Sequence, residues 1–399
     1  MIEKRKTILI VGGGYADIPL IKAAKDLDYY VITSGNRPDE LGHTISDEYW
    51  PADFSDPDAI FELAKKLDVD AICPCCNDFS AISSAYAAEK LGLPGFDSYE
   101  TSQLIHHKDS YREFAKKNAI ASPNARGFDN IEEVESSIKD FRFPLIVKPV
   151  DLTGGKGIMS VADLVELKSA LQEAFKISKL GRVVVEEFIE GSRHGFSAFI
   201  CEGKVVFHFT DNELYYLNQY MVSAALAPST VPESAIHDLI SQSEKISQIL
   251  SLKNGIFHVQ FILRDDKPVI IEICRRPPGD LYIKLVELAT GIDYSSWIVR
   301  AFCGLDCSGL RQNDVTGYFL RHCVMASNNG VLSAVDVEPT IKKNIIDSMM
   351  WGKSGDTVDN FLVAKFGIVF LKFNSMDELL NKSANMQNLI CANVSKNCE

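Results

Sequence analysis

The chain has 399 residues, 46% of them hydrophobic and 24% charged, so it can form roughly two to four packed units and lies far from the composition of disordered chains. A formal net charge of -13 argues against a nucleic-acid partner, which would need a basic surface. The longest uncharged apolar stretches, such as residues 7–16, are too short to cross a bilayer. We therefore expect a globular, cytoplasmic protein with no nucleic-acid and no membrane partner.

Residues 7 to about 120 alternate predicted strands and helices. The strands are expected at 7–11, 30–33 and 71–73, and helices from about residue 17 and over 57–67, the latter capped by Ser55. Such alternation predicts a parallel sheet covered by helices, with ligands at the carboxyl ends of its strands. The expected fold class is therefore α/β, beginning with a Rossmann-like domain.

Three glycines, Gly12 to Gly14, follow the first predicted strand and so lie at the ligand edge of this sheet. The third glycine of a GxGxxG dinucleotide motif is missing. Two interpretations stay open: a dinucleotide-binding loop, and a loop that contacts a substrate or only packs.

The ten cysteines are scattered, which is typical of reduced thiols that serve as small hydrophobic residues. The segment 73–76 contains a CxxC pattern at the end of a predicted strand, but no second pair lies at zinc spacing. A structural role and a redox or metal role are the two alternatives for this segment.

A lysine at the end of an apolar strand, followed by a glycine-rich loop, marks the most informative stretch of the chain. Lys148 ends the apolar run 143–148, and the loop 153–157 reads Thr-Gly-Gly-Lys-Gly. Glycines let backbone N–H groups turn toward phosphate oxygens, and Lys148 and Lys156 add positive charge. The stretch lacks the spacing of a P-loop, yet it predicts a site for a nucleotide triphosphate.

A second unit begins near residue 122 and is small enough to act as a lid. A helix over 162–175 and a strand over 182–187 follow the glycine loop, and a hairpin over 195–201 and 204–209 comes next. After a helix at about 233–252, a second hairpin pairs 257–263 with 269–274. Its alternation directs His258, Gln260 and Ile262 to one face and Glu272 and Cys274 to a matching one, which gathers polar groups beside the phosphates.

The order of these motifs resembles the ATP-grasp superfamily from about residue 5 to about residue 300, and more weakly beyond. Within it the chain looks most like the carboxylate–amine ligase, carbamoyl-phosphate synthetase and biotin carboxylase branch. The resemblance implies an α+β ATP-grasp fold with a Rossmann-like domain (1–121), a lid (122–190), a central domain with a magnesium site (191–310) and a C-terminal subdomain (311–399).

The resemblance assigns ATP contacts residue by residue. Lys108 and Lys148 match the two lysines that stabilise the α and β phosphates, although both could instead be surface lysines. The loop 153–157 matches the phosphate flap, and Lys156 would reach the γ-phosphate. The complete set of implied ATP ligands is Lys108, Lys148, Gly154, Gly155, Lys156, Gly157, Glu186, Glu187, Phe188, Ile189 and His194.

Adenine would be bonded by the backbone of Glu187 and Ile189 in the hinge 184–191, as the resemblance implies. The carboxylate of Glu186 or Glu187 would bond the amino group or the ribose. His194 stands where several relatives hold ribose hydroxyls, and its alternative is an ordinary surface histidine.

The metal site implied by the resemblance consists of Gln260 and Glu272, binding Mg²⁺ or Mn²⁺. Cys274 takes the place of the usual asparagine, and a soft thiol is a poor magnesium ligand. Arg276 matches the arginine that steadies the transferred phosphoryl group, so the implied catalytic residues are Arg276, Lys156 and Lys148. Arg275 is an extra charge that would pair with a substrate carboxylate or phosphate.

The implied activity is an ATP-dependent ligase that joins a carboxylate to an amine through an acyl phosphate, with release of ADP and phosphate. An amino acid or related small acid is the expected carboxylate. The alternatives are a purine-pathway synthetase of the phosphoribosylglycinamide synthetase type, and a nucleotide-binding protein that has lost turnover. The expected partners are small-molecule carboxylate and amine substrates, and a homodimer is compatible with this class.

Overall fold

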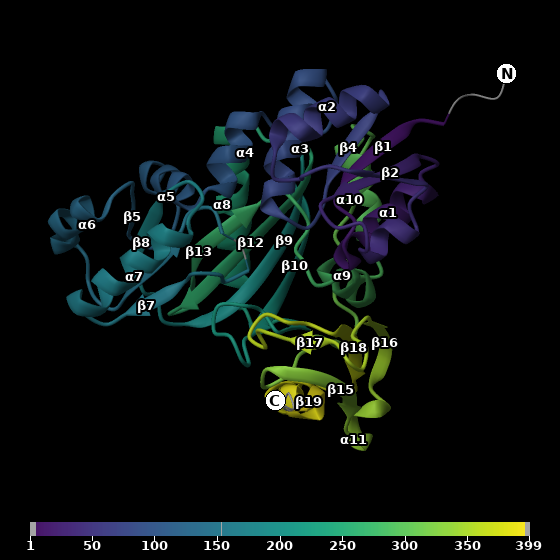
Figure 1. The fold of residues 1–399 in the computed structure, drawn as a ribbon. Coiled ribbons are helices and arrows are strands. Elements are labelled where there is room, and N and C mark those ends of the chain that lie inside the picture. The colour runs from purple at the N-terminus through teal and green to yellow at the C-terminus, as the bar shows by residue number, and fades with distance from the viewer. Residues whose placement is uncertain (1–4, 153, 396–399) are drawn as a thin grey trace. The chain divides into compact units, whose positions relative to one another are not determined.

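The computed structural model describes residues 5–152 and 154–395, without the side chain of Glu135. Figure 1 shows the helices and strands along the chain, which divides into two compact units. Unit 1 comprises Met1–Phe209, Pro232–Gly279 and Asp293–Gln312, and unit 2 comprises Thr210–Val231, Asp280–Ile292 and Asn313–Glu399.

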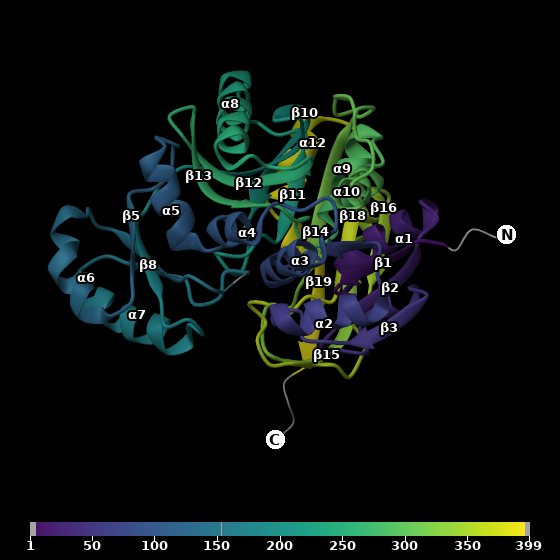
Figure 2. The ribbon, with the colours of Figure 1, turned by 90° about the horizontal axis from the view of Figure 1, so that it is seen from above.

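The N-terminal part of unit 1 is the parallel sheet that the alternation predicts. Its strand order is β3-β2-β1-β4, and every pairing is parallel. The helices pack in pairs, α2 on α3 and α1 on α10, and Figures 1 and 2 show the two pairs on different sides of the sheet. The elements are β1 (Thr7–Val11), α1 (Ile18–Asp26), β2 (Tyr30–Gly35), β3 (Glu48–Pro51), α2 (Pro57–Leu67), β4 (Ala71–Pro74), α3 (Asp78–Leu91), α4 (Tyr99–His106), α5 (Lys108–Lys117) and α10 (Tyr294–Phe302).

Two helix starts in this domain depend on side-chain caps. Helix α2 spans the predicted residues, but Asp56 caps it rather than Ser55, because the Asp56 carboxylate accepts the N–H groups of Asp58 (3.0 Å) and Ala59 (3.2 Å). Helix α3 is capped by Asn77, whose side chain accepts the N–H of Phe79. Asp78 therefore sits in the first turn of α3, where the helix dipole favours negative charge.

The segment predicted as a lid forms its own antiparallel sheet, in the order β5-β8-β6-β7. One face of α7 buries Leu167, Ala170, Leu171 and Ala174 in a core with Val147 and Val185. Helix α7 begins two residues later than predicted because Asp163 caps it. The elements are β5 (Ala125–Phe128), α6 (Ile131–Ser137), β6 (Leu145–Pro149), β7 (Met159–Val161), α7 (Leu164–Ile177) and β8 (Val183–Glu187).

The remaining strands of unit 1 lie in the order β13-β12-β9-β10, with α8 packed against β13 and β9. Gln260 lies directly opposite Glu272, and His258 opposite Cys274, so the predicted sharing of a face is confirmed. A bulge follows Gln260 and shifts the register beyond it. The elements are β9 (Ser192–Cys201), β10 (Lys204–Leu214), α8 (Glu233–Leu250), β12 (Gly255–Arg264) and β13 (Lys267–Cys274).

Unit 2 is assembled from three separate chain segments, whereas the sequence suggests one continuous C-terminal segment. The end of β10 passes into it and pairs with β11, which continues as β11-β14-β18-β16, while β17-β15-β19 form a second sheet. The Tyr216 hydroxyl donates to the Ser383 carbonyl (2.6 Å) and ties the first segment to the last. The elements are β11 (Ala224–Ala227), α9 (Tyr282–Thr290), β14 (Tyr318–Val324), β15 (Gly330–Val337), α11 (Pro339–Lys342), β16 (Ile345–Met350), β17 (Thr357–Val358), β18 (Gly367–Phe373), α12 (Met376–Ser383), α13 (Met386–Leu389) and β19 (Ile390–Ser395).

Two sequence expectations concern features that the described residues can test. Every cysteine among them is a free thiol, and most are buried. None of the described helices has both the length and the apolar character needed to span a membrane.

The lid core yields a stability prediction. Leu171→Ala should lower the free energy of unfolding by about 2–5 kcal/mol, because Leu171 is 1% exposed in the α7 core and its loss leaves a cavity. Val165→Ala on the same helix is the matched control, since Val165 is 81% exposed. Urea unfolding followed by lid-localised hydrogen exchange measures both. Equal protection of the lid in the two variants would contradict the described core.

Candidate functional site

The glycine-rich loop joins β6 to β7 in the lid and adopts a left-handed backbone that favours glycine. Gly154, Gly155 and Gly157 have φ values of +67°, +75° and +70°. A Cβ on Gly157 would lie 2.4 Å from the Cδ1 of Ile177, so a larger residue here would require the Ile177 side chain to move as well as a left-handed backbone. Lys156 is exposed at the tip. Thr153 lies outside the described residues.

Lys148, in β6, belongs to a buried charge cluster. Its Nζ lies 2.7 Å from one oxygen of Glu186 in β8, and Arg112 Nη2 lies 2.8 Å from the other. Burial by itself raises the pKa of the Glu186 carboxyl, but Arg112 and Lys148 hold that pKa below its ordinary value. Burial lowers the pKa of Lys148, and the neighbouring cations Arg112 and Lys108 lower it further. Glu186 raises this pKa, but the net result stays below the ordinary value. One carboxylate thus lies between two buried cations.

Lys108, the first residue of α5, connects the glycine loop to the predicted metal hairpin. Its Nζ donates to the carbonyl of Leu152 (2.8 Å) and lies 3.5 Å from Glu272 Oε1. Lys108, Arg112 and Lys148 therefore surround two carboxylates, which leaves one positive charge in excess. Such an excess suits a bound polyanion, because buried charge is costly without a partner.

The two predicted metal ligands are neighbours across the strands β12 and β13. Gln260 and Glu272 face each other in register and offer an amide oxygen and a carboxylate. Magnesium commonly takes one or two protein oxygens together with substrate phosphates, so this pair fits a phosphate-bound ion rather than an all-protein cage. Accordingly, the described residues hold no group of three or more His, Cys, Asp or Glu side chains suited to a metal.

Cys274 lies two residues beyond Glu272 and is 4% exposed. Burial raises the pKa of its thiol to about 12, so the sulfur stays protonated at neutral pH. Its Sγ lies 3.5 Å from the carbonyl oxygen of Arg276. These properties describe a packed small side chain.

Arg276 lies beside this hairpin and is held by the N-terminal sheet domain. Its Nε lies 2.8 Å from Asp78 Oδ1, and its Nη1 donates to the Pro277 carbonyl (3.1 Å). Burial opposes the charged form, yet Asp78 foremost, with Cys274 and Glu272, raises the pKa of Arg276 well above its ordinary value. The guanidinium therefore remains charged next to Glu272.

Arg275 does not occupy the role suggested for it. Its Nε lies 2.8 Å from Asp97 Oδ2, its Nη2 donates to the Lys253 carbonyl (2.7 Å), and its Nη1 donates to the Ile256 carbonyl. All three nitrogens are used within the protein and the residue is buried. The expectation of a substrate contact is wrong because Arg275 fastens the chain around β12.

The hinge after β8 offers backbone groups rather than side chains. The Glu187 carboxylate accepts from Asn124 Nδ2 (3.2 Å) and from the Arg142 N–H (3.1 Å), while Phe188 N–H donates to the Pro144 carbonyl. Among the described residues, no acceptor pairs with the Ile189 N–H. This leaves the N–H available to an adenine edge.

Two further expectations for the nucleotide need correction. The Glu186 carboxylate is committed to Lys148 and Arg112 and is not directed at a base or a ribose. His194 is 1% exposed, its Nε2 lies 2.7 Å from Ser192 Oγ, and its ring stacks on Phe261 opposite it in β12. The alternation of β9 turns His194 into the core, so it is neither a ribose ligand nor a surface histidine in this structure.

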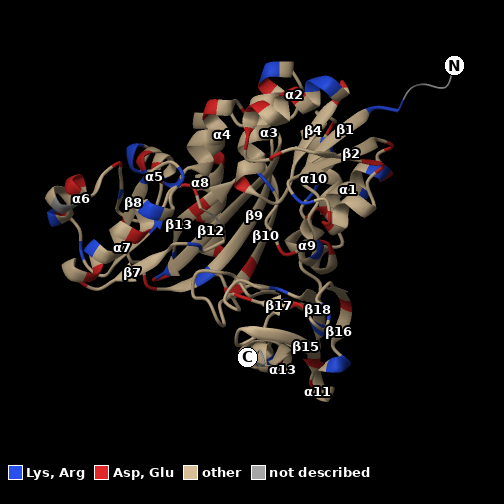
Figure 3. Ribbon diagram, in the orientation of Figure 1, with Lys and Arg blue, Asp and Glu red and all other residues tan. Residues whose placement is uncertain are grey.

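Sequence reasoning missed Arg112, Asp78 and His106. Arg112 follows Lys108 by one helical turn, so both project from the same side of α5, and that spacing was a signal that could have identified it. Asp78 and His106 carry no such signal, because only the tertiary fold brings them to Arg276. Figure 3 shows acidic and basic residues interspersed along α2, α5 and α7.

Comparison with known proteins agrees with this geometry. A family model described as phosphoribosylglycinamide synthetase, ATP-grasp (A) domain, matches residues 106–213. The formate-dependent phosphoribosylglycinamide formyltransferase of Prochlorococcus marinus (strain MIT 9515) is 25% identical over 346 residues, covering 84% of this chain and 87% of that protein. The phosphoribosylamine–glycine ligase of Pyrococcus furiosus is 29% identical over 288 residues, and the match covers 66% of this chain and 65% of that protein.

Solved structures share the fold along nearly the whole chain. An L-amino acid ligase from Bacillus licheniformis superposes with a TM-score of 0.82 at 18% identity, covering 98% of this chain and 100% of that one. The family model covers the segment from the end of α4 into β10, which holds Lys108, Lys148 and the glycine loop. The resemblance to the ATP-grasp superfamily noted from the sequence is thereby confirmed: the matched segment is similar to an ATP-grasp domain, and the fold is shared along nearly the whole chain.

Proposed function

We propose that the chain is an ATP-dependent carboxylate–amine ligase, which forms an amide bond through an acyl phosphate and releases ADP and phosphate. The observation that carries this proposal is the convergence around an uncompensated positive charge of Lys108 from α5, Lys148 from β6, and Glu272 and Arg276 from β13 and the residues just after it. Relatives named as a glycine ligase and a formyltransferase support the same class of chemistry.

In the proposed nucleotide site, Lys108 and Lys148 compensate charge on the α and β phosphates. The loop 154–157 covers the triphosphate, with Lys156 near the γ-phosphate, and the backbone of Glu187 and Ile189 bonds the adenine edge. Gln260 and Glu272 would hold Mg²⁺ or Mn²⁺, which when bound neutralises phosphate charge and orients the γ-phosphate.

The proposed reaction needs no covalent nucleophile from the protein. The substrate carboxylate attacks the γ-phosphate in line, while Lys148, Lys156 and Arg276 stabilise the charge on the transferring group. The amine then attacks the acyl carbon, phosphate leaves, and the amine loses a proton to give the amide. A closed glycine loop would keep water from the acyl phosphate.

The proposed carboxylate is an amino acid or a related small acid, and the partners are small-molecule carboxylates and amines. A homodimer stays a prediction, as do the four domain boundaries. The second candidate is a purine-type synthetase, which the family model over residues 106–213 favours. Phosphate release with a panel of amino acids and with phosphoribosyl amines separates the two substrate classes.

Nucleotide binding gives the first prediction for this site. Lys148→Ala should weaken Mg-ATP binding by at least about 10-fold, since hydrogen bonds to charged groups contribute about 1.5–3 kcal/mol. Lys176→Ala is the control, because Lys176 is 76% exposed and its ion pair among the described residues is with Glu173 on the same helix. Calorimetry measures both. Unchanged affinity and turnover in both Lys108→Ala and Lys148→Ala would contradict the nucleotide site.

The products give a second prediction. A true substrate should yield ADP and phosphate in equal amounts, because the lysines and the metal pair are placed for attack at the γ-phosphate. Chromatography of the nucleotides together with a phosphate assay measures this. Formation of AMP and pyrophosphate would indicate adenylation, and absence of turnover with every acid and amine pair would favour the binding-only alternative.

The metal pair gives a third prediction. Glu272→Ala should abolish turnover, while Cys274→Asn should lower the magnesium concentration needed for activity if the amide oxygen reaches the ion. If Cys274 only packs, the buried amide should reduce stability by roughly 1–3 kcal/mol. Magnesium titration and melting temperature, measured on the same variant, separate these outcomes. A stable but inactive Cys274→Asn enzyme would contradict both readings.

A further inference from the structure

One carboxylate oxygen joins three elements that are far apart in the sequence. Asp78 Oδ1 lies 2.8 Å from Arg276 Nε and 2.9 Å from His106 Nδ1. Asp78 is the first residue of α3, His106 is the last residue of α4, and Arg276 follows β13. The three side chains are 10%, 1% and 14% exposed, respectively, so the contact is nearly removed from solvent.

The electrostatics favour an ionised Asp78. Burial alone would raise the pKa of the Asp78 carboxyl, but Arg276 and His106 hold it well below its ordinary value. The start of helix α3 also favours negative charge at this position. A charge-assisted bond of this kind fixes the guanidinium more firmly than a neutral acceptor would.

The contact with Asp78 occupies only one of the three nitrogens of the Arg276 guanidinium. Nε is used by Asp78 and Nη1 by the Pro277 carbonyl, while no acceptor among the described residues pairs with Nη2. Because the guanidinium is planar, fixing Nε also fixes the direction in which Nη2 can donate. An oxygen of a transferring phosphoryl group is the acceptor that the proposed reaction would supply.

His106 extends the same contact toward the phosphate lysines. It lies two residues before Lys108, the first residue of α5, and His107 between them is the N-cap of that helix. The hydrogen bond that His106 Nδ1 donates to Asp78 therefore holds the junction of α4 and α5 in place, and with it the start of the helix that carries Lys108.

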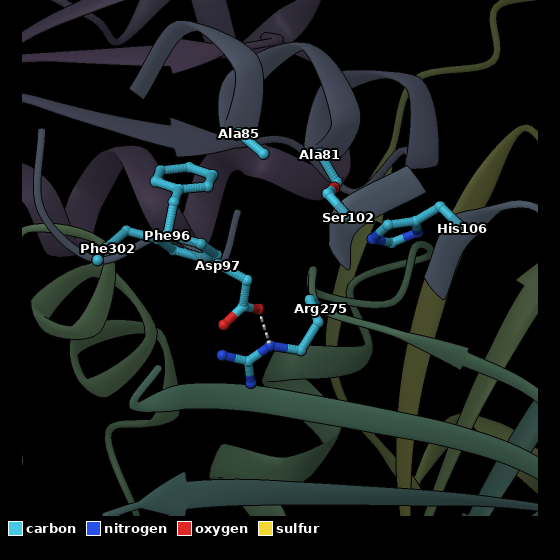
Figure 4. Close-up of a pocket in the computed structure, with 9 residues that line it drawn as sticks. Ala81, Ala85, Phe96, Asp97, Ser102, His106, Arg275 and Phe302 are labelled. Carbon is cyan, nitrogen blue, oxygen red and sulfur yellow. Dashed lines mark hydrogen bonds and ion pairs between the residues drawn. The ribbon is translucent and has the colours of Figure 1, made fainter. Parts of the chain in front are cut away.

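A small cavity borders the other side of the His106 ring. Figure 4 shows Ser102 beside the His106 ring at one end of it, Phe96 and Phe302 at the other, and the Asp97–Arg275 pair between them. The cavity measures about 20 Å³, enough for one water, and no described residue pairs with His106 Nε2. Within the described protein the ring is therefore oriented through Nδ1 and Asp78 alone. The Asp97–Arg275 pair is a separate buried ion pair of similar exposure.

We propose that Asp78 and His106 are positioning residues, with Asp78 orienting Arg276 toward the γ-phosphate and His106 holding the segment that carries Lys108. This inference rests on the proposed function, since it takes Arg276 to face the transferring group. Neither residue contacts the reacting atoms. Substitution of Asp78 or His106 should therefore weaken the interactions with the γ-phosphate and leave adenine binding at the hinge unchanged.

The test compares the affinity for an ATP analogue with an imido β–γ bridge with the affinity for ADP, both as magnesium complexes, by calorimetry. Asp78→Ala should lower the analogue affinity on the order of 10-fold and leave the ADP affinity within about 2-fold, because misplacing a group by 1 Å can cost up to about 100-fold. Asp78→Asn keeps an acceptor oxygen and should recover part of the loss. With a substrate pair in hand, kcat should fall more than KM rises.

Two variants of His106 provide a second test by the same affinity measurements. The amide nitrogen of His106→Asn can replace Nδ1 as donor to Asp78, whereas His106→Leu cannot. His106→Asn should therefore keep more of the analogue affinity than His106→Leu. Equal affinities in these two variants would contradict the role of His106.

Asp97→Ala is the matched control for lost stability, because Arg275 keeps its bonds to the Ile256 and Lys253 carbonyls. It should lower the melting temperature and leave the ratio of analogue to ADP affinity unchanged. The proposal is overturned if Asp78→Ala keeps the wild-type ratio, or if Asp97→Ala changes the ratio equally. A wild-type protein that binds both nucleotides without turnover would refute the ligase proposal, while the affinity ratio would still decide the positioning role.

Discussion

The candidate site depends on a charge imbalance that the folded protein maintains inside unit 1. Arg112 and Lys148 share the single carboxylate of Glu186, and Lys108 lies near Glu272, so three cations meet two anions. Buried positive charges close to one another are unfavourable unless enough negative charge lies beside them, and a bound anion would supply the missing charge. The β-sheet of the lid and helix α5 hold these groups before any ligand arrives. A triphosphate that enters therefore meets donors that are already oriented, which is the condition for electrostatic stabilisation of a transferring group.

The same site gathers residues from parts of the chain that otherwise have separate cores. The lid supplies Lys148 and the glycine loop, α5 supplies Lys108, and the β12–β13 hairpin supplies Gln260 and Glu272. The N-terminal domain also takes part, because Asp78 at the start of α3 pairs with Arg276. A carboxylate and an amine would meet the γ-phosphate beside Arg276, so the N-terminal domain contributes to the reaction by orientation rather than by chemistry.

The local sequence pattern was sufficient to predict several strands and part of the candidate site. The alternation of apolar residues predicted β1, β6 and the β12–β13 hairpin, and it placed Gln260 and Glu272 on one face because side chains in a strand alternate. The sequence pattern failed to predict the direction of a side chain where that direction depends on tertiary packing. His194 lies in a polar segment that resembles a surface loop, yet strand β9 begins at Ser192 and turns the ring into the core. Arg275 and Arg276 are adjacent and similar, and only Asp97 and Asp78, from distant segments, give them different roles.

The central claim is that a carboxylate attacks the γ-phosphate held by this cluster. It is tested most directly by running the reaction with a carboxylate substrate labelled with oxygen-18 and examining the released phosphate by mass spectrometry. Attack on the γ-phosphate leaves one carboxylate oxygen on that phosphorus, so the account predicts one labelled oxygen in each phosphate released. Unlabelled phosphate, or label recovered in AMP, would contradict it.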